Sequence, residues 1–267
     1  MAREDDRTSA PTPDARDLRV LTWNVDGLSE SQLGERMETL CLEITIGGDL
    51  EAAAAGRPTP PMPHVIALQE VVRVAHLAYF APHLSAAGFS LWPGGPPEGR
   101  EYYEVLAVRA PWALERCERR PFADSPLARA GTIATLRHAE SEQRLVVITG
   151  HLESLRSGSD ARLAQAREIA SWMAAEPSPA IFAGDTNLRD AEWKSIEPEL
   201  GLRDAFVELG SPKACRATWY PEDDRRTGFR FDRMWLCGSV SAQSMRLRRC
   251  RGSSDHAGVE TALRLDA

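Results

Sequence analysis

The stretch AIFAGDTNLRD (residues 180–190) joins an apolar run of the strand type to a polar cluster. Residues 180–183 suit a buried β-strand, and Asp185, Thr186 and Asn187 follow where a strand alone needs no polar side chain. Active groups in layered α/β proteins gather where strands end and loops begin, because the sheet fixes their positions there. The stretch therefore predicts a sheet protein with a polar site at one end of the sheet.

Further runs of the strand type recur along the chain, and amphipathic stretches lie between some of them. The runs are LRVLTW near residue 20, HVIALQE near 67, YYEVLAV near 105, TIATLR near 134, RLVVITG near 146, AIFAG near 182 and RMWLCG near 235. Apolar residues three and four apart predict helices in SQLGERMETLCLEI, from Ser31, and in ARLAQAREIASWMAA, from Ala161. This pattern is typical of the α/β or α+β class.

The domain organisation follows from two polar or proline-bearing segments. Residues 1–16 are polar and contain prolines, which predicts a disordered N-terminal tail ahead of one domain over residues 17–267. Residues 47–63, GGDLEAAAAGRPTPPMP, are typical of a loop or linker. Chemically suggestive residues lie on both sides of this insert, so we expect it to interrupt a single domain and not to separate two.

The composition limits the classes of function. The chain has 267 residues, 43% of them hydrophobic and 27% charged, with a formal net charge of -7. An acidic balance excludes the uniformly basic surface that coats duplex nucleic acid, so phosphate binding must be local. Five scattered cysteines without a CxxC pair argue against a disulfide framework and a zinc knot, which favours a reducing cytoplasm. No apolar run has the length of a signal peptide or a membrane span, so we expect no membrane partner.

Four short segments each end a strand-type run with polar residues. They are TWN (22–24), LQE (68–70), GDTN (184–187) and SDH (254–256). Taken singly, Asn24 suits a turn, Glu70 a surface charge, Asp185 a helix cap and His256 a packed histidine. Because all four follow the same strand-to-loop pattern, we favour a common site in which their side chains face one another.

The order and spacing of these segments, with GHLES (150–154), resemble the endonuclease/exonuclease/phosphatase superfamily. Within it the chain is similar to the 5'-tyrosyl-DNA phosphodiesterases, from about residue 18 to the C-terminus. The shared segments are LTWNVDGL, VIALQEV, GHLES with Arg156, IFAGDTNLRD, ATW and RFDRMW. The resemblance implies a four-layered α/β sandwich of the DNase I type, with two packed mixed β-sheets flanked by helices and the site at one end of the sheets.

The residues support a magnesium site, in which Mn²⁺ would substitute for Mg²⁺. Glu70 offers a hard carboxylate ligand with Asn24 near it, and magnesium needs few protein ligands because it keeps several waters. The sequence has no cysteine and histidine cluster, which argues against zinc. By resemblance, Asp255 lies by the metal, with structural support as the alternative.

The remaining motif residues suit the hydrolysis of a phosphodiester. Asp185 is the candidate to accept the proton of the attacking water, Asn187 orients that water or a phosphate oxygen, and His256 stabilises the phosphoryl charge. By resemblance, Asp232 in RFDRM is the carboxylate that holds the ring of His256. His151 in GHLES is expected to donate to the phosphate, and its alternative is structural support alone.

The resemblance also implies residues that bind the substrate. Ser154 and Arg156 lie close to the substrate strand, while Arg189 and Trp219 match a pair that forms a cation–π contact at the junction of tyrosine and phosphate. Phe231 and Tyr102 form an apolar wall for the first nucleotides. Core packing is the alternative for the three aromatic residues. Tyr103 replaces Tyr102 if the alignment shifts by one position.

Arginines cluster in two further runs, which are typical of solvated faces or of a surface that steers a nucleic-acid strand. The runs are Arg225, Arg226, Arg230 and Arg233, and then Arg246, Arg248, Arg249 and Arg251.

The resemblance implies a monomeric, magnesium-dependent enzyme of DNA repair. It would hydrolyse the bond between a protein tyrosine and a DNA or RNA 5' end, leaving a 5'-phosphate. Its partners would be single-stranded nucleic-acid 5' ends that carry a tyrosyl or peptide adduct. The alternatives are a general metal-dependent nuclease acting at abasic sites or 3' ends, a lipid or inositol phosphoesterase, and a catalytically dead module that binds nucleic-acid ends. The dead module ranks last, because the residues suited to catalysis are all present.

Overall fold

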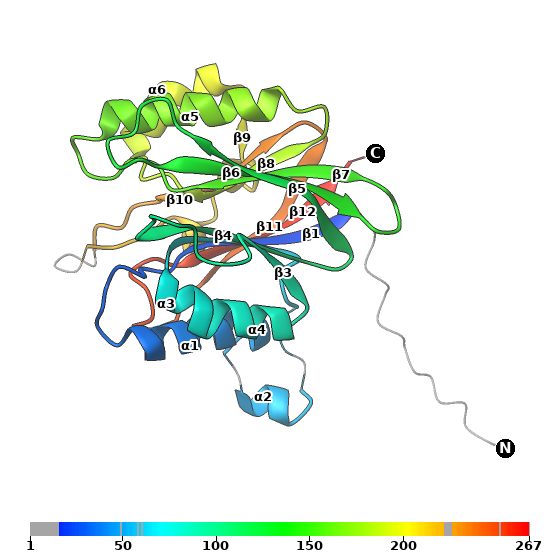
Figure 1. The fold of residues 1–267 in the computed structure, drawn as a ribbon. Coiled ribbons are helices and arrows are strands. Elements are labelled where there is room, and N and C mark those ends of the chain that lie inside the picture. The colour runs from blue at the N-terminus through cyan, green and yellow to red at the C-terminus, as the bar shows by residue number, and fades with distance from the viewer. Residues whose placement is uncertain are drawn as a thin grey trace.

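The computed structural model describes residues 16–48, 50–57, 59, 61–221, 226–250 and 252–266. Apart from Arg16, the tail expected at residues 1–16 therefore lies outside the described residues. Two six-stranded sheets form the centre of the molecule (Figure 1). The first has the order β11 (Val240–Arg248), β12 (Gly258–Leu265), β1 (Asp17–Asn24), β2 (Val65–Val72), β4 (Tyr102–Arg109), β3 (Phe89–Trp92). The second has the order β5 (Trp112–Pro121), β6 (Ala130–His138), β7 (Arg144–Gly150), β8 (Ala180–Asp185), β10 (Asp232–Cys237), β9 (Arg203–Asp204).

Helices cover the outer face of each sheet. Figure 1 shows α1 (Leu33–Ile46), α3 (Arg73–Ala75) and α4 (Ala81–Ala86) outside the first sheet, with the π-helical turn η1 (His76–Phe80) between α3 and α4. On the second sheet lie α5 (Ser159–Ala174) and α6 (Asp190–Leu200). The short elements α2 (Leu50–Ala54), α7 (Ala205–Glu208) and η2 (Lys213–Cys215) complete the fold. The four-layered sandwich with two mixed sheets is thereby confirmed.

Strand alternation builds the layers. In β8, Ile181 and Ala183 join the core between the two sheets, whereas Ala180 and Phe182 face α5 and α6. Side chains alternate between the faces of a strand, so a strand buried on both faces reads as a continuous apolar run. Each fully buried aliphatic or aromatic side chain contributes about 1.5–3 kcal/mol relative to exposure. The apolar run before Asp185 therefore fixes that residue at the end of a rigid central strand.

Two expectations about local structure are correct only in part. Residues 47–63 contain α2, because the run LEAAA consists of good helix formers, so the insert is not loop throughout. The arginine clusters form solvated faces only in part: Arg226, Arg246 and Arg249 are exposed, whereas Arg230, Arg233 and Arg248 are buried, Arg233 at 1% and Arg248 at 4% exposure. Arg233 pairs with buried Asp204, and Arg248 pairs with buried Glu260, which offsets the cost of burying the charges. Arg225 and Arg251 lie outside the described residues.

Several strands were not predicted, including the half-exposed β3, β5 and β11 and the largely buried β12. In β5, charged residues on the open face interrupt the apolar pattern that marks a buried strand. Among the helices of the described residues, none combines the length and the apolar character that crossing a membrane requires.

Candidate active site

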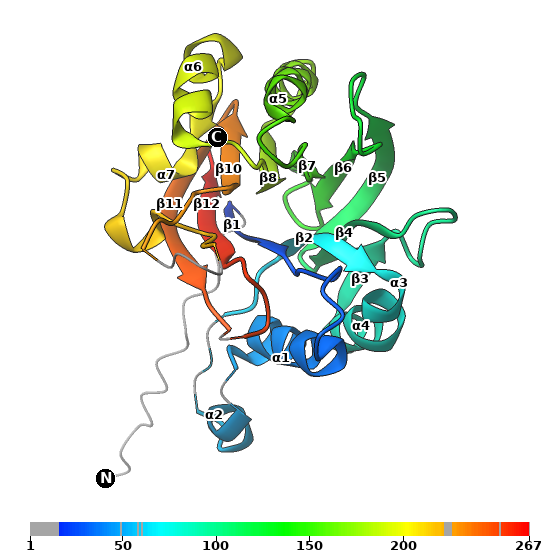
Figure 2. The same cartoon turned by 90° about the vertical axis from the view of Figure 1, so that its left-hand side faces the viewer.

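The ends of several central strands bring the motif residues together at one end of the sandwich (Figure 2). Asn24 ends β1, and its neighbour in the parallel strand β2 is the residue before Glu70. Asp185 ends β8, where it pairs with Asp232 of β10 and forms a backbone bridge with His151 after β7. Strand register therefore forms two groups, Asn24 with Glu70 in the first sheet and Asp185, Asp232 and His151 in the second.

The carboxylate of Asp185 is the centre of the cluster. Asn24 Nδ2 donates a hydrogen bond to Oδ2 of Asp185 at 3.0 Å, and Nε2 of His151 lies 3.3 Å from the same oxygen. Nε2 of His256 lies 3.7 Å from that oxygen. The backbone N–H of Asn187 donates to Oδ1 at 2.9 Å. Asn24, His151, Asn187 and His256 thus surround one carboxylate, as the convergence of their motifs predicts.

Glu70 occupies a bulge in β2, where its backbone has a positive φ of 56°. Non-glycine residues with positive φ are strained, and such strain persists where the surrounding structure enforces it. Gly27 contributes to this position, because a β-carbon there would lie 2.1 Å from the carbonyl oxygen of Glu70. Close packing of the two backbones therefore directs Glu70 into the site.

The electrostatics of Glu70 suit a cation. Burial raises the pKa of its carboxyl to about 7, and Asp185 adds to this, while a hydrogen bond with Asn24 opposes it. Among the described residues, its ion-pairing contact within 4 Å is His151, whose Nδ1 lies 3.6 Å away. Burial lowers the pKa of His151 to about 3, against the attraction of Asp185, so this ring is neutral. A buried carboxylate with a neutral neighbour fits a Mg²⁺ ligand.

His256 and Asp232 form a carboxylate–histidine pair. Nδ1 of His256 lies 2.8 Å from Oδ2 of Asp232. Burial lowers the pKa of His256, but the attraction of Asp232 and Asp185 outweighs it and raises the pKa to about 10. The ring is therefore a fixed cation at neutral pH, with Nε2 directed toward Asp185.

A second arrangement for a metal uses Asp185, Asp232 and His256, whose ligand atoms lie within 4.8 Å of one another. A cation there would compete with the hydrogen bond that holds His256 to Asp232. Mg²⁺ prefers oxygen ligands, and an ion near Glu70 leaves that pair intact. The geometry therefore favours the Glu70 side.

Asp255 and Trp219 are bonded to each other beside His256. Trp219 Nε1 donates to Oδ2 of Asp255 at 2.6 Å, and the indole lies 6.4 Å from the ring of His256. Arg189 lies 3.9 Å from Glu192, at the start of α6. The expected cation–π contact between Arg189 and Trp219 is not among the ring contacts of the described residues.

The predicted strand-binding residues divide into exposed and packed ones. Arg156 is exposed, and Ser154 accepts a hydrogen bond from Arg129 at 3.3 Å. Arg129 also lies 5.8 Å from the ring of half-buried Tyr102. The hydroxyl of Tyr103 is buried 2.9 Å from Nδ1 of His76, so Tyr102 is the tyrosine that faces the surface.

Phe231 belongs mainly to a packed aromatic cluster. It is 7% exposed and stacks on Phe229 with ring centroids 5.2 Å apart and planes inclined by 13°. Trp219 lies 5.3 Å from Phe231. Core packing, the alternative weighed for this residue, accounts for most of its surface.

Two residues near the site were not predicted. Asp26 lies two positions after Asn24 and donates its backbone N–H to Oδ1 of that asparagine at 3.0 Å. Glu153 is buried and accepts hydrogen bonds from Ser125, from the backbone N–H of Leu127 and from Gln165. The acidic positions in WNVDGL and GHLES were the available signal. The partners of Glu153 are 12 to 28 residues away, so its role required the structure.

Comparison with known proteins agrees with this geometry. The pattern of the Endonuclease/Exonuclease/phosphatase family matches residues 21–256, and the chain belongs to this family. Fold and site together define a phosphodiesterase. Tyrosyl-DNA phosphodiesterase 2 of Danio rerio is 28% identical over 268 residues, which are 91% of this chain and 65% of that protein. The protein of that name from Bos taurus is 28% identical over 271 residues, covering 94% of this chain and 69% of the relative. The chain thus spans about two thirds of the length of these relatives.

Solved structures show the same relationship. The D. rerio protein in complex with a single-strand DNA product has a TM-score of 0.74 at 27% identity and covers 93% of this chain and 99% of that chain. The catalytic domain of human Nocturnin with a bound sulfate anion has a TM-score of 0.67 at 20% identity, which shows the shared fold. The structural similarity to tyrosyl-DNA phosphodiesterase 2 therefore extends over 93% of this chain.

Proposed function

We propose that this chain is a magnesium-dependent phosphodiesterase that hydrolyses the 5'-phosphotyrosyl bond between a protein tyrosine and a nucleic-acid 5' end. One observation carries the proposal: Asn24, His151, Asn187 and His256 all contact Asp185, beside the buried carboxylate of Glu70. The similarity to proteins called tyrosyl-DNA phosphodiesterase 2 supports the tyrosyl substrate.

Glu70, with Asn24 beside it, would hold Mg²⁺ or Mn²⁺, whose charge offsets that of the phosphoryl oxygens, and Asp255 would join the site as the resemblance implies. Asp185 then accepts a proton from the attacking water. Both of its oxygens already accept one hydrogen bond, which fixes the carboxylate in place and leaves lone pairs for the water. Asn187, whose Nδ2 donates to the carbonyl of Leu152 at 3.1 Å, keeps its amide oxygen for the water or a phosphate oxygen.

The two histidines have different charges and therefore different roles. His256, protonated and held by Asp232, stabilises the negative charge on the phosphoryl oxygens. His151 is neutral and offers an uncharged ring N–H to the same group. The positive charge of His256, next to the neutral N–H donor of His151, would offset the negative charge of the phosphate, so the mechanism requires no second metal ion.

The bond changes balance without a dedicated general acid. The water oxygen bonds to phosphorus, its proton passes to Asp185, and the phosphorus–oxygen bond to tyrosine breaks. A phenol has a pKa of about 10, so the departing tyrosine oxygen needs little protonation in the transition state. Solvent then protonates it. The products are free tyrosine, or its peptide, and a 5'-phosphate.

The nucleic-acid strand would lie on the side of Ser154, Arg156 and Tyr102, where aromatic and cationic groups bind single-stranded ends without reading sequence. Arg189 and Trp219 would contact the junction of tyrosine and phosphate, and Phe231 would support the indole from below. Repair of protein-linked DNA ends, with RNA ends as an alternative substrate, is the corresponding role. A monomer in the cytoplasm remains our expectation.

A panel of substrates tests the proposal. Purified protein with Mg²⁺ should release tyrosine from a single-stranded 5'-phosphotyrosyl oligonucleotide, and chelation should abolish the release. An abasic duplex, a blocked 3' end and bis-p-nitrophenyl phosphate serve as alternatives in the same assay. If the protein prefers the abasic duplex or the 3' end, the proposal is wrong and the chain is a general metal-dependent nuclease.

A further inference from the structure

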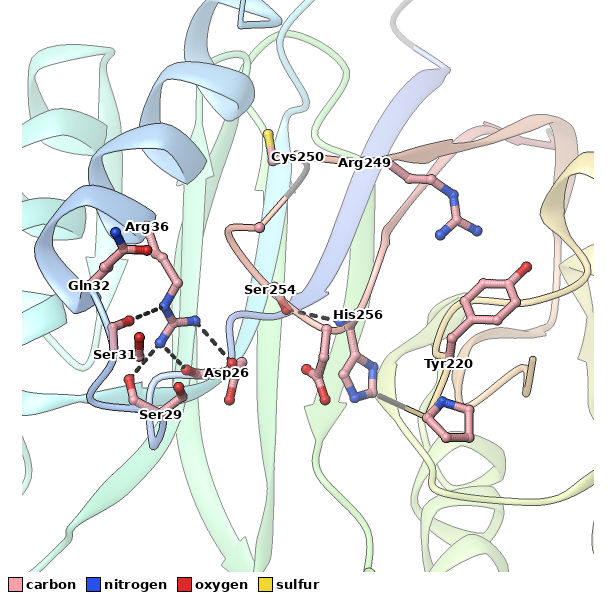
Figure 3. Close-up of a pocket in the computed structure, with 13 residues that line it drawn as sticks. Asp26, Ser29, Ser31, Gln32, Arg36, Tyr220, Arg249, Cys250, Ser254 and His256 are labelled. Carbon is pink, nitrogen blue, oxygen red and sulfur yellow. Dashed lines mark hydrogen bonds and ion pairs between the residues drawn. The ribbon is translucent and has the colours of Figure 1, made fainter. Parts of the chain in front are cut away.

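Buried arginines hold the loops around the catalytic centre. In the cleft of about 620 Å³ beside His256, Arg36 of α1 donates to the carbonyl oxygen of Asp26 at 2.8 Å (Figure 3). Arg36 also donates to the carbonyl oxygen of Ser253 at 3.0 Å, so it ties the loop after β1 to the loop between β11 and β12. A second buried arginine, Arg162 of α5, holds the segments that follow β7 and β8.

Arg162 and Glu192 form a bidentate ion pair between α5 and α6. Nε of Arg162 donates to Oε2 of Glu192 at 3.1 Å, and Nη2 donates to Oε1 at 2.6 Å. The side chain of Arg162 is 0% exposed and that of Glu192 is 14% exposed, so salt screens the pair little. Burial raises the pKa of Glu192, but hydrogen bonds from Arg162 and Ser159 outweigh it and lower the pKa to about 2. The pair therefore stays charged at neutral pH.

The remaining arm of the guanidinium holds the segment after β7. Nη1 of Arg162 donates to the carbonyl oxygen of Glu153 at 3.1 Å and to that of Leu155 at 2.7 Å. The backbone of Leu155 has a φ of 64°, which is strained for a residue with a side chain. Leu155 stands between Ser154 and Arg156, the two residues of this segment that we assign to the substrate. Arg162 thus fixes the bend from which both side chains leave the chain.

Glu192 holds the segment after β8. The backbone N–H of Arg189 donates to Oε2 of Glu192 at 2.8 Å, which is part of the capping box at the start of α6. Oγ of Ser159 donates to Oε1 at 2.6 Å. With the two bonds from Arg162, each carboxylate oxygen of Glu192 accepts two hydrogen bonds within the protein. A carboxylate has about four acceptor sites, so Glu192 has none left for a substrate or a metal.

The two held segments bring Arg156 and Arg189 close together. Burial lowers the pKa of Arg189, and the positive charges of Arg162 and Arg156 add to this effect. Glu192 opposes it, with Oε1 3.9 Å from Nη1 of Arg189. The spacing between the cations of the two segments therefore depends on the one carboxylate that lies among them.

We propose that Arg162 and Glu192 are positioning residues, which set the spacing between Arg156 and Arg189 and thereby the affinity for the substrate. The inference rests on the proposed function, which assigns those two arginines to the substrate. In the described part of the chain, no hydrogen bond or ion pair of Arg162 or Glu192 reaches the cluster around Asp185. The chemical step should therefore proceed at nearly its normal rate once the substrate is bound.

Conservative changes in the pair test this inference. Glu192→Gln keeps the length of the side chain and removes its charge. The KM for a single-stranded 5'-phosphotyrosyl oligonucleotide with Mg²⁺ should rise about fivefold or more, while kcat changes by less than about threefold. Arg162→Lys keeps the charge but lacks the planar fork that bonds to Glu192 and to two carbonyl oxygens, so it should have the same effect. A merely structural role would lower the apparent kcat through unfolded protein and leave KM unchanged.

The same two helices supply a matched control. Arg167 of α5 and Glu199 of α6 form an ion pair at 2.6 Å, in which both side chains are 50% exposed. This pair lies farther along both helices than Arg162 and Glu192, and exposed pairs contribute little. Glu199→Gln and Arg167→Lys should therefore keep the KM and kcat of the wild-type protein.

A second measurement asks whether the pair acts through the two arginines. In a protein that already carries Arg156→Ala and Arg189→Ala, Glu192→Gln should raise KM by less than about twofold, because the groups that it positions are gone. The full increase in that background, or an unchanged KM in Glu192→Gln or in Arg162→Lys, would overturn the inference while the wild-type protein still releases tyrosine. No release of tyrosine by the wild-type protein would instead refute the proposed function.

Discussion

Nδ1 of His256 lies 2.8 Å from Oδ2 of Asp232, and this contact keeps a buried imidazole protonated. Burial alone would lower the pKa of His256, and the neighbouring carboxylates raise it to about 10. On the alkaline side, the wild-type rate should therefore fall only as the pH approaches about 10 and His256 loses its proton. Asp232→Asn removes the nearest carboxylate, so the pKa drops and the loss of activity should begin at a pH lower by about one unit or more. The pH profile of kcat/KM measures this.

The control for this prediction is Asp190→Asn, which removes an exposed carboxylate from the start of α6. Its pH profile should match that of the wild-type protein. An Asp232→Asn protein whose alkaline limb stays in place would show that Asp232 does not set the charge of His256.

Replacing the carboxylate of Asp185 should remove the proton acceptor and leave the fold intact. Asp185→Asn is expected to lower kcat by about two orders of magnitude or more, with a smaller effect on KM. The new amide also places an N–H group against the donors of Asn24 or Asn187, which adds to the loss. Steady-state kinetics with circular dichroism as a check on folding measure the effect. Turnover at the wild-type rate would exclude Asp185 from the mechanism.

Glu70→Gln should weaken metal binding and stabilise the metal-free protein. Burial raises the pKa of Glu70 from 4.5 to about 7. Because burial favours the protonated carboxyl, Glu70 contributes to the stability of the folded protein. This contribution is fully present below pH 4.5 and is lost as the pH rises through about 7. At about pH 8 with chelator, the Gln variant should therefore melt at a higher temperature than the wild-type protein.

Added metal should invert that difference. Mg²⁺ or Mn²⁺ should raise the Tm of the wild-type protein and have a much smaller effect on Glu70→Gln, with an affinity at least about tenfold lower by calorimetry. Glu101→Gln changes an exposed carboxylate and serves as the control. Equal metal affinities in the wild-type protein and Glu70→Gln would place the cation elsewhere, for example among Asp185, Asp232 and His256.

Gly27→Ala should disturb the site through the backbone. A β-carbon at this position would lie 2.1 Å from the carbonyl oxygen of Glu70, so the bulge that directs Glu70 must shift. We expect a lower Tm and a kcat/KM reduced by about tenfold or more, since small displacements of catalytic groups are costly. Gly94→Ala meets no atom within 4 Å and should leave both values unchanged. A Gly27→Ala protein as active and stable as Gly94→Ala would refute the packing argument.

Much of the fold and the centre of the site could be predicted from the sequence, for a local reason. Asn24, Glu70 and Asp185 each follow an apolar run, and a strand fixes the direction in which the next residues point. The family resemblance added the roles of His151 and Asp232, which no single strand-type run of the sequence indicates. β5 and β11 escaped because half-exposed strands with charged residues lack the apolar run of a buried strand.

What could not be predicted depends on contacts between distant parts of the chain. Arg36 reads as an ordinary helix residue, yet it donates to the carbonyl of Ser253, 217 residues away. Arg233 and Arg248 look like surface charges until their buried partners are known. The cleft beside His256 arises from three loops that no local pattern connects. Side-chain burial and pairing of this kind are tertiary properties.

The most direct test of the central claim identifies the bond that breaks. The protein is incubated with Mg²⁺ and a 5'-phosphotyrosyl oligonucleotide in water enriched in the heavy oxygen isotope, and the products are weighed by mass spectrometry. Attack of water on phosphorus from the Asp185 side predicts one heavy oxygen in the 5'-phosphate of the oligonucleotide and unlabelled tyrosine. Phosphotyrosine together with a 5'-hydroxyl oligonucleotide, or uncleaved substrate in a folded protein, would contradict it.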